Sequence, residues 1–181
     1  MKPSLAFAIL LSVTLFSCSK EEENSVYDSQ ETRISTFIDN QLESDTTYSV
    51  VYNEKATRLI VKEGEGDQLS SSGTISFFYA GYAFTGTTIN SDNLFATNDK
   101  ETADGIKWAL SDSTAFNVLT INLSDSDLIE GLKSALPGVR SGEECYILFS
   151  GKYGYGKHKV GTIPAKCALA YHIRVESINN E

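Results

Sequence analysis

The region that runs from Leu128 into the final alternating stretch Ala168–Val175 limits most strongly what this chain can fold into. In that last stretch apolar side chains occupy every second position, so one face carries Leu169, Tyr171, Ile173 and Val175. Because successive side chains of a strand point to opposite faces, this pattern predicts a strand with one buried face. Half-buried strands are typical of antiparallel sheets, so we expect such a sheet to dominate the fold.

Two helices and several further strands are predicted around this strand. Over residues 30–43, apolar side chains at i, i+3, i+4 and i+8 predict an amphipathic helix, with Asp28 and Glu31 as a capping box. A short helix is predicted over residues 127–136, with caps at 124–126 and a Pro-Gly stop after it. Strands are predicted over residues 48–52, 58–62, 74–84, 119–123 and 145–149. This order of strands, one short helix and more strands indicates the α+β class.

The N-terminus is predicted to direct and anchor the protein rather than to join the fold. Lys2 precedes the apolar run Leu5–Phe16, which fits a secretory signal and is shorter than the roughly 20 residues of a membrane helix. The run ends in Leu15-Phe16-Ser17-Cys18, which resembles a bacterial lipobox. That resemblance implies a signal peptide at residues 1–17 and lipidation of Cys18. Ordinary signal cleavage with an incidental Cys is the alternative.

The residues after Cys18 suggest where an anchored protein would reside. Residues 18–28 are predicted to be a lipidated Cys and a disordered polar tether, because they are acidic and poor in apolar side chains. Ser19 resembles the second residue of lipoproteins sent to the outer membrane. The run Lys20–Glu23 resembles the short acidic export signals of surface lipoproteins in Bacteroidetes, or it is only a solvated linker. We therefore expect an outer-membrane lipoprotein on the periplasmic or the cell-surface face.

Charge and side-chain chemistry argue against several classes of function. A net charge of −9 argues against a nucleic-acid partner, which would call for a basic patch. His158 and His172 lack the spacing of metal ligands, so neither a metal site nor a cofactor is predicted. Cys145 falls in a predicted strand and Cys167 in a loop, and we expect both thiols to stay unpaired.

Several short motifs follow one another in a fixed order in the second half of the chain. They are Leu128-Ile129-Glu130-Gly131-Leu132, then Gly142, then Tyr153-Gly154-Tyr155-Gly156, then Ile163-Pro164, and the final strand. In this order they resemble the C-terminal half of an FKBP-type peptidyl-prolyl isomerase domain, with its Val-Ile-x-Gly-Trp, Ala-Tyr-Gly, Ile-Pro-Pro and Leu-x-Phe motifs. The resemblance implies an FKBP-like twisted antiparallel β-sheet wrapped around one short α-helix at residues 66–179, behind an N-terminal helix–hairpin extension at residues 29–65.

The same resemblance implies a site made of apolar and aromatic side chains. Rotation of an X-Pro amide requires no nucleophile, metal or cofactor, only surroundings that favour the twisted amide over the planar one. Matched position by position, the implied catalytic residues are Tyr79, Phe95, Ile129 and Tyr155. The implied substrate-binding residues are Leu119, Leu128, Leu132, Thr162, Ile163 and Tyr171.

Three departures from the family pattern bear on activity. Ala96 stands where the family has a pocket Asp, and Leu119 and Leu132 replace aromatic residues. A long insert at residues 97–118 contains Trp108, which we expect either to cover the pocket or to pack locally.

The resemblance predicts a peptidyl-prolyl cis-trans isomerase that acts on X-Pro bonds of exported proteins and is held to the membrane by lipid. Its expected partners are proline-containing proteins or peptides, the membrane through the lipid anchor, and a macrolide ligand. One alternative is a non-catalytic binding or chaperone module of the outer membrane, in which turnover is lost through Ala96. Another is a structural subunit of an outer-membrane assembly that uses the N-terminal extension as its interface.

Overall fold

The computed structural model of the chain describes residues 15–108, 116–124 and 127–181. Its helices are α1 (Leu15–Ser44), α2 (Lys100–Gly105) and α3 (Glu130–Ala135), with short 3-10 helices η1 (Ser91–Asn93) and η3 (Gly151–Tyr153). Its strands are β1 (Ser49–Tyr52), β2 (Thr57–Lys62), β3 (Thr74–Phe84), β4 (Leu94–Thr97), β5 (Leu119–Asn122), β6 (Glu144–Phe149) and β7 (Ala168–Asn179).

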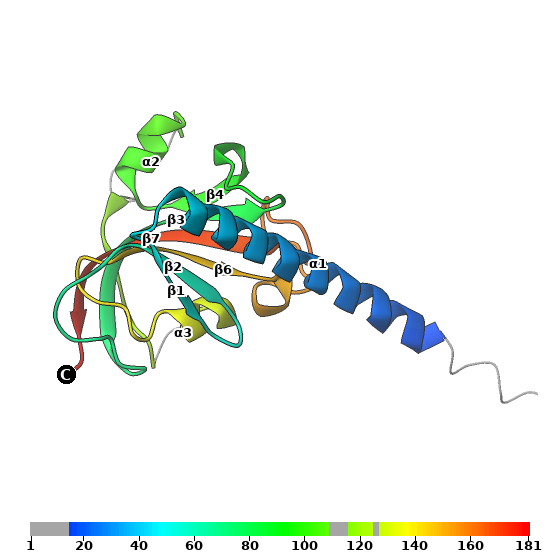
Figure 1. Cartoon of the computed structure of the whole chain (residues 1–181), viewed down its shortest axis with the longest axis horizontal. Coiled ribbons are helices and arrows are strands. Elements are labelled where there is room, and N and C mark those ends of the chain that lie inside the picture. The colour runs from blue at the N-terminus through cyan, green and yellow to red at the C-terminus, as the bar shows by residue number, and fades with distance from the viewer. Residues whose placement is uncertain (1–14, 109–115, 125–126) are drawn as a thin grey trace, which may run out of the picture.

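One antiparallel sheet of seven strands forms the centre of the molecule (Figure 1). The strand order is β1-β2-β6-β7-β3-β4, and β5 pairs with β3 beside β4. The longest pairing joins β3 to β7, from Thr74 opposite Asn179 to Phe84 opposite Ala168. Both strands show the alternating pattern that a half-buried strand requires. The α+β class and the predicted arrangement of an antiparallel β-sheet around one short helix are confirmed by this sheet and by α3.

The hairpin of β1 and β2 is an integral part of that sheet. Strand β2 pairs with β6, for example at Ile60 opposite Cys145. Arg58 of β2 is buried and donates from Nη1 to the carbonyl oxygens of Ala135 at 2.7 Å and Pro137 at 3.1 Å. The same guanidinium forms a buried ion pair with Glu143, with Nε and Oε1 3.4 Å apart. Arg58 therefore satisfies carbonyl groups that the end of α3 leaves without helical partners.

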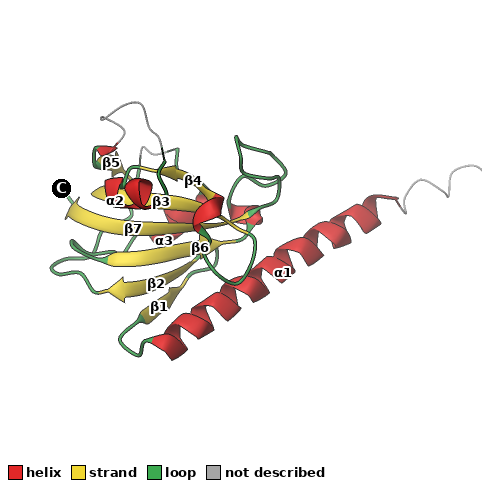
Figure 2. Ribbon diagram, turned by 90° about the horizontal axis from the view of Figure 1, so that it is seen from above, coloured by secondary structure: helices red, strands yellow, loops and turns green. Residues whose placement is uncertain are grey.

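Apolar side chains pack on both faces of the sheet, each face under its own helix (Figures 1 and 2). On one face Ile34, Phe37 and Ile38 of α1 pack against Leu59, Phe84, Leu148, Ala168 and Ala170. On the other face α3 contributes Leu132 and Ala135 to a larger core that includes Ile75, Phe77, Ile147, Phe149, Leu169, Tyr171 and Ile173. Helix α3 lies close to the sheet at Gly131, where a Cβ atom would collide with the ring of Phe149.

Helix α1 differs from the prediction at its N-terminal end. It begins at Leu15, so residues 19–28, predicted to be a disordered tether, are helical. The predicted capping box was wrong because Asp28 lies inside the helix, where its carbonyl accepts from the Thr32 hydroxyl at 3.0 Å. Tyr27 and Gln30 are already buried, so docking of α1 starts before the predicted first turn. Extending a formed helix by further residues costs little compared with starting it.

Helix α3 is shorter than the helix predicted over residues 127–136. Its N-cap residue is Ile129, in extended backbone with ψ 148° and without a side-chain cap hydrogen bond. The predicted side-chain cap was therefore wrong for the part of the segment that is described, while Asp125 and Ser126 lie outside the described residues. The reason is that Leu128 and Ile129 reach a cavity beside the helix from an extended segment.

The described residues contain neither a membrane-spanning helix nor a cluster of metal ligands. None of the described helices is both long and apolar enough to cross a membrane. Within the same residues, no group of three or more His, Cys, Asp or Glu side chains is placed to hold a metal ion. Cys145 is buried and Cys167 is partly buried, and both are free thiols.

Candidate functional site

A cavity of about 460 Å³ lies on the α3 side of the sheet, a volume within the roughly 300–1,000 Å³ of typical ligand pockets. We call it the apolar cavity. It is lined by Phe77, Tyr79, Phe95, Ala96, Leu119, Asp127, Leu128, Ile129, Leu132, Tyr155, Val160, Gly161, Thr162, Ile163 and Tyr171. All ten residues predicted as catalytic or substrate-binding are among these, although strands, α3 and loops supply them from distant parts of the chain. Their individual catalytic and binding roles stay predictions.

Tyr171 is at the centre of the aromatic side of the cavity. Its ring centroid lies 6.3 Å from that of Tyr79 and 5.7 Å from that of Phe95, the latter in an edge-to-face arrangement. Behind it, the Phe149 ring stacks nearly parallel at 6.0 Å. The rings of Phe95 and Tyr171 approach because β3 carries Gly81 between them, where a Cβ atom would lie 2.7 Å from the Phe95 ring. Such geometries fix aromatic rings and exclude water from the wall.

The hydroxyls of Tyr79 and Tyr171 in the cavity wall are held in their neutral form. Burial, followed by the neighbouring phenol of Tyr155, raises the pKa of Tyr79 above its ordinary value. Burial is also the main cause that raises the pKa of Tyr171, and the phenol of Tyr155 adds to it. A neutral phenol donates one hydrogen bond and accepts others. At neutral pH the cavity therefore offers hydrogen-bond donors on an otherwise apolar wall.

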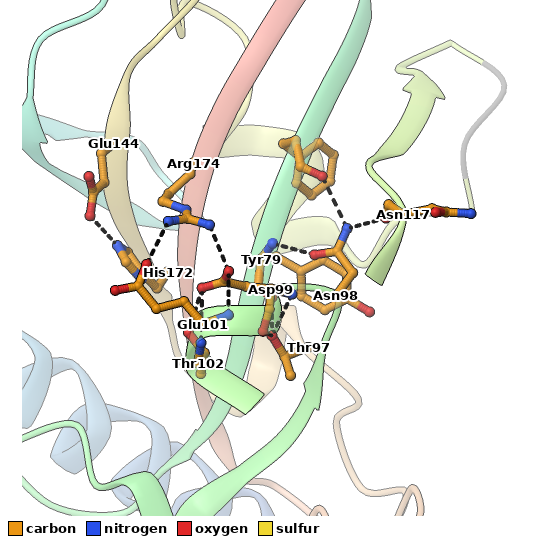
Figure 3. A network of polar contacts seen from close by, with 11 residues as sticks. Tyr79, Thr97, Asn98, Asp99, Glu101, Thr102, Asn117, Glu144, His172 and Arg174 are labelled. Carbon is orange, nitrogen blue, oxygen red and sulfur yellow. Dashed lines mark hydrogen bonds and ion pairs between the residues drawn. The ribbon is translucent and has the colours of Figure 1, made fainter. Parts of the chain in front are cut away.

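Asn98 fixes the part of β3 that carries Phe77 and Tyr79 (Figure 3). On this edge of β3, β5 pairs with residues 74–77 and β4 with residues 80–82, which leaves a gap between the two ladders. The Asn98 side chain fills the gap: Oδ1 accepts from the Tyr79 amide at 2.6 Å, and Nδ2 donates to the Phe77 carbonyl at 3.2 Å. Nδ2 also donates to the Asn117 carbonyl at 3.0 Å, so Asn98 joins both ends of the insert to the cavity wall.

Asp99, the next residue, attaches α2 to the sheet (Figure 3). As the N-cap of α2 it accepts hydrogen bonds from the amides of Glu101 and Thr102. The same carboxylate forms an ion pair with Arg174 of β7, with Oδ1 and Nη2 2.6 Å apart. Arg174 also lies over the Phe78 ring, 5.7 Å from its centroid. The first helix of the insert is thereby held against the sheet face opposite the apolar cavity.

The segment 151–166 forms another wall of the cavity and is held by main-chain hydrogen bonds. Val160 and Ile163 exchange two of them, at 3.1 and 2.8 Å, and the Lys166 amide donates to the Gly156 carbonyl at 2.5 Å. Gln30 of α1 reaches both ends of the segment, donating to the Lys166 carbonyl at 2.5 Å and accepting from the Gly151 amide at 2.8 Å. The helix on the far face of the sheet therefore positions part of the cavity wall.

Five lining residues were not among the predicted site residues: Phe77, Ala96, Asp127, Val160 and Gly161, of which Ala96 was named only as the position where the family has an Asp. Phe77 could have been found, since it lies two positions before Tyr79 on one strand and therefore on the same face. Val160 and Gly161 directly precede Thr162, which was predicted. Trp108 is not among the lining residues of the described chain, and its amide donates to the Ala103 carbonyl at 2.9 Å, at the end of α2.

Ala96 brings only a methyl group to the cavity, and Asp127 is the one charged residue among those that line it. The lining therefore combines apolar side chains, tyrosine hydroxyls and a single carboxylate. Within the described residues the wall has no pair of acid and base groups and no cluster of metal ligands. Such a wall favours a reactant that becomes less polar as it reacts.

Comparison with known proteins gives consistent matches. The model of one family, described as FKBP-type peptidyl-prolyl cis-trans isomerase, matches residues 66–176. FK506-binding protein 1 of Aspergillus oryzae is 24% identical over 122 residues, which cover 67% of this chain and 97% of that protein. A peptidyl-prolyl cis-trans isomerase of Pseudomonas syringae has a similar structure, with TM-score 0.56 and 14% identity over 87% of this chain and 96% of its own. FkpA of Escherichia coli gives TM-score 0.56 and 15% identity over 91% of this chain and 66% of its own.

Proposed function

The chain belongs to the FKBP-type peptidyl-prolyl cis-trans isomerase family, and from this we propose that it isomerises X-Pro bonds of client proteins in the apolar cavity. The observation that supports the proposal most is the composition of the cavity wall. Aromatic and aliphatic side chains surround a volume of about 460 Å³, with neutral tyrosine hydroxyls as donors. This volume accommodates a proline and parts of its neighbours.

The proposed mechanism relies on the change in polarity of the amide. Planar amides are stabilised by resonance, and rotation about the C–N bond has a barrier of ~18–20 kcal/mol. In the twisted transition state the resonance is lost, and the amide becomes less polar. An apolar wall from which water is excluded then favours the transition state over the planar ground state. The tyrosine hydroxyls hold the flanking carbonyl groups and so fix the peptide in a conformation that permits rotation.

We assign individual roles on the same basis. Tyr155 donates its hydroxyl to a carbonyl of the bound peptide, while Tyr79 and Phe95 form the wall against which the proline ring rotates. Ile129 is the N-cap residue of α3, where backbone amides have no helical partner, and we assign its amide the role of donor to a substrate carbonyl. The remaining predicted residues enclose the peptide: Leu119, Leu128, Leu132, Thr162, Ile163 and Tyr171.

A second function is favoured by one specific observation, the methyl group of Ala96 in the cavity wall. If catalysis requires a carboxylate at this position, the same cavity serves as a non-catalytic binding or chaperone module. The Tyr171 phenol offers another polar partner to Tyr155, and we propose that it supports turnover without that carboxylate.

The cis–trans isomerisation rate of a proline-containing peptide tests both functions. We expect the purified full chain to accelerate it in proportion to its concentration, and Tyr155→Phe to reduce the acceleration. A wild-type rate equal to the uncatalysed rate would contradict the isomerase proposal. Saturable binding of the same peptide without acceleration would then favour the binding module, and restored turnover in Ala96→Asp would assign the loss to Ala96. Competition by a macrolide FKBP ligand would locate either activity in the apolar cavity.

We further propose that the protein is exported and held by lipid at Cys18 on the outer membrane, facing the periplasm or the cell surface. The support is the order of Lys2, the apolar run and Leu15-Phe16-Ser17-Cys18. Clients would then be proteins that fold outside the cytoplasm. Metabolic labelling with a fatty-acid analogue should mark the wild-type chain and leave Cys18→Ala unlabelled. Equal labelling of both chains would contradict the anchor site, and accessibility to added protease in intact cells would decide the face.

A further inference from the structure

The segment 152–166, which we call the basic loop, has a charge opposite to that of the whole chain. The net charge of the protein is −9, yet none of its 24 Asp and Glu residues lies between Cys145 and Val175. The basic loop itself carries Lys152, Lys157, His158, Lys159 and Lys166. Positive charge is therefore concentrated beside the apolar cavity, since Tyr155 and residues 160–163 of the same loop line it.

The positive charge of this loop faces solvent and is only partly compensated. Lys152, Lys157, His158 and Lys159 are exposed, and Lys166 is partly exposed. Over the described residues, neither Lys159 nor Lys166 takes part in an ion pair, whereas the cations of Lys55, Arg58, Lys100, His172 and Arg174 do. Lys152 lies over the ring of Tyr153, 5.1 Å from its centroid. Lys159 and Lys166 are thus available to an anionic ligand.

The loop is also close enough to act on a peptide in the cavity, and it is held in place. Lys159 directly precedes Val160, so their Cα atoms are about 3.8 Å apart. Because the Debye length is ~8 Å at physiological salt, the charge of such a side chain is only partly screened from a peptide at the cavity mouth. The hydrogen bonds of Val160 with Ile163, and of Gln30 with Lys166 and with Gly151 just before the loop, hold the backbone of the loop beside the cavity.

We propose that the basic loop selects client segments that carry Asp or Glu near the proline. The inference rests on the proposed function, because the apolar cavity must bind the proline itself. Exposed charges at the edge of a binding site act mainly on the rate of association and on its salt dependence. The selection is therefore expected in kcat/KM rather than in kcat.

Because of Asp127, we expect the selection to depend on which side of the proline the acidic residue of the client lies. It is the only charged residue among those that line the cavity, and its carboxylate repels an acidic residue placed beside it. An acidic residue that faces the basic loop is attracted, whereas one that faces Asp127 is not. We therefore expect the preference for acidic residues on one side of the proline only.

The test uses the full chain and matched peptides that carry Glu, Gln or Lys two positions before or after the proline. At low ionic strength we expect kcat/KM for the best Glu peptide to exceed that for its Lys counterpart about three- to tenfold. This range corresponds to the contribution of two exposed ion pairs. The ratio should fall towards one in 0.5 M salt. Lys159→Gln combined with Lys166→Gln should remove most of the preference and leave the Gln peptide unaffected. Lys62→Gln combined with Lys133→Gln, which changes the net charge equally outside the basic loop, should retain it.

The outcomes separate this inference from the proposed function. Measurable turnover of all peptides with equal kcat/KM for Glu and Lys would overturn the inference and leave the isomerase proposal intact. An equal loss of preference in the Lys62 and Lys133 control would assign the effect to net charge and overturn it as well. Absence of turnover on every peptide would contradict the proposed function, and the same peptide series in a binding assay would then test the loop by itself.

Discussion

The two faces of the sheet carry comparable apolar surfaces but use them differently. On the α1 face, Phe37 packs edge-on against Phe84 and Tyr146, at 5.7 and 6.1 Å, and the helix lies along this face. On the α3 face the helix has six residues, and the side chains beyond it enclose the apolar cavity instead of filling it. A cavity that side chains leave unfilled costs packing energy. The comparison indicates that the long helix stabilises the sheet, which lets the short helix leave space for a ligand.

Arg58→Ala should give the largest effect, because it removes the cation that holds the end of α3. Glu143 would remain buried without its partner, and the Ala135 carbonyl would lose its donor. Breaking a buried ion pair in this way costs about 3–5 kcal/mol in the free energy of unfolding, measured by urea denaturation. As a control, the double variant Arg58→Met and Glu143→Leu should lose clearly less free energy of unfolding, since no buried charge remains. An equal loss of unfolding free energy in the single and the double variant would show that the ion pair stabilises the α3 face by its attraction alone.

Phe37→Ala is the matching change on the α1 face. We expect a loss of about 3 kcal/mol, because the change opens a hole among buried rings, with Phe37→Leu costing much less. The kcat/KM of the folded molecules should stay within about twofold of wild type, since Phe37 acts through packing only. If kcat/KM falls together with stability, the α1 face also supports activity, and the proposed difference between the two faces is wrong. Urea denaturation and peptide isomerisation on the same samples would decide.

Asn98→Ala should affect both stability and the cavity wall. It leaves the Tyr79 amide and the Phe77 carbonyl without partners, which costs about 2 kcal/mol for buried groups. Because these two residues line the cavity, we expect kcat/KM to fall as well, mainly through kcat. Asn93→Ala provides a control, since Asn93 donates to an exposed Thr85 hydroxyl away from the cavity. A loss of stability with unchanged kcat would reduce Asn98 to a structural role.

Tyr171→Phe should have the smallest effect and isolates one hydroxyl group. We expect kcat/KM to fall about fivefold, the range of one net hydrogen bond, with little change in the melting temperature. Tyr153→Phe is the matched control, because Tyr153 is outside the cavity lining. An unchanged kcat/KM in Tyr171→Phe would mean that the phenol does not stand in for the carboxylate absent at Ala96.

Repeating patterns made the strands predictable. Strand β3 was predicted at its observed bounds, because Ile75, Phe77 and Tyr79 stand at every second position and so share one face. The start of α1 was missed because residues 19–28 are acidic and give no apolar pattern, and only the buried contacts of Tyr27 and Gln30 indicate that the helix extends there. The place of β2 in the central sheet also has no local pattern, since pairing with β6 is decided by residues far away in the sequence.

The residues of the candidate site that lie in family motifs could be predicted from the sequence. Residues that support the site through single polar contacts could not. Tyr155 and Ile163 lie in motifs with a recognisable order, and the structure brings them to one cavity. Asn98 holds β3 through an amide that reaches a gap between two ladders, and no spacing rule predicts such a contact. Asp127 lines the cavity because α3 starts later than the sequence suggests, which only the backbone reveals.

If the protein is anchored at Cys18, as proposed, helix α1 has a mechanical consequence. The part of the helix that remains, residues 18–44, makes a rod of about 40 Å, and its first part extends beyond the sheet (Figure 2). A flexible tether would let the domain turn freely above its attachment point. A helix that ends in the domain and contacts the basic loop through Gln30 instead transmits orientation from the attachment point to the cavity mouth. The direction in which clients approach would then be set by the angle at which this rod leaves the surface.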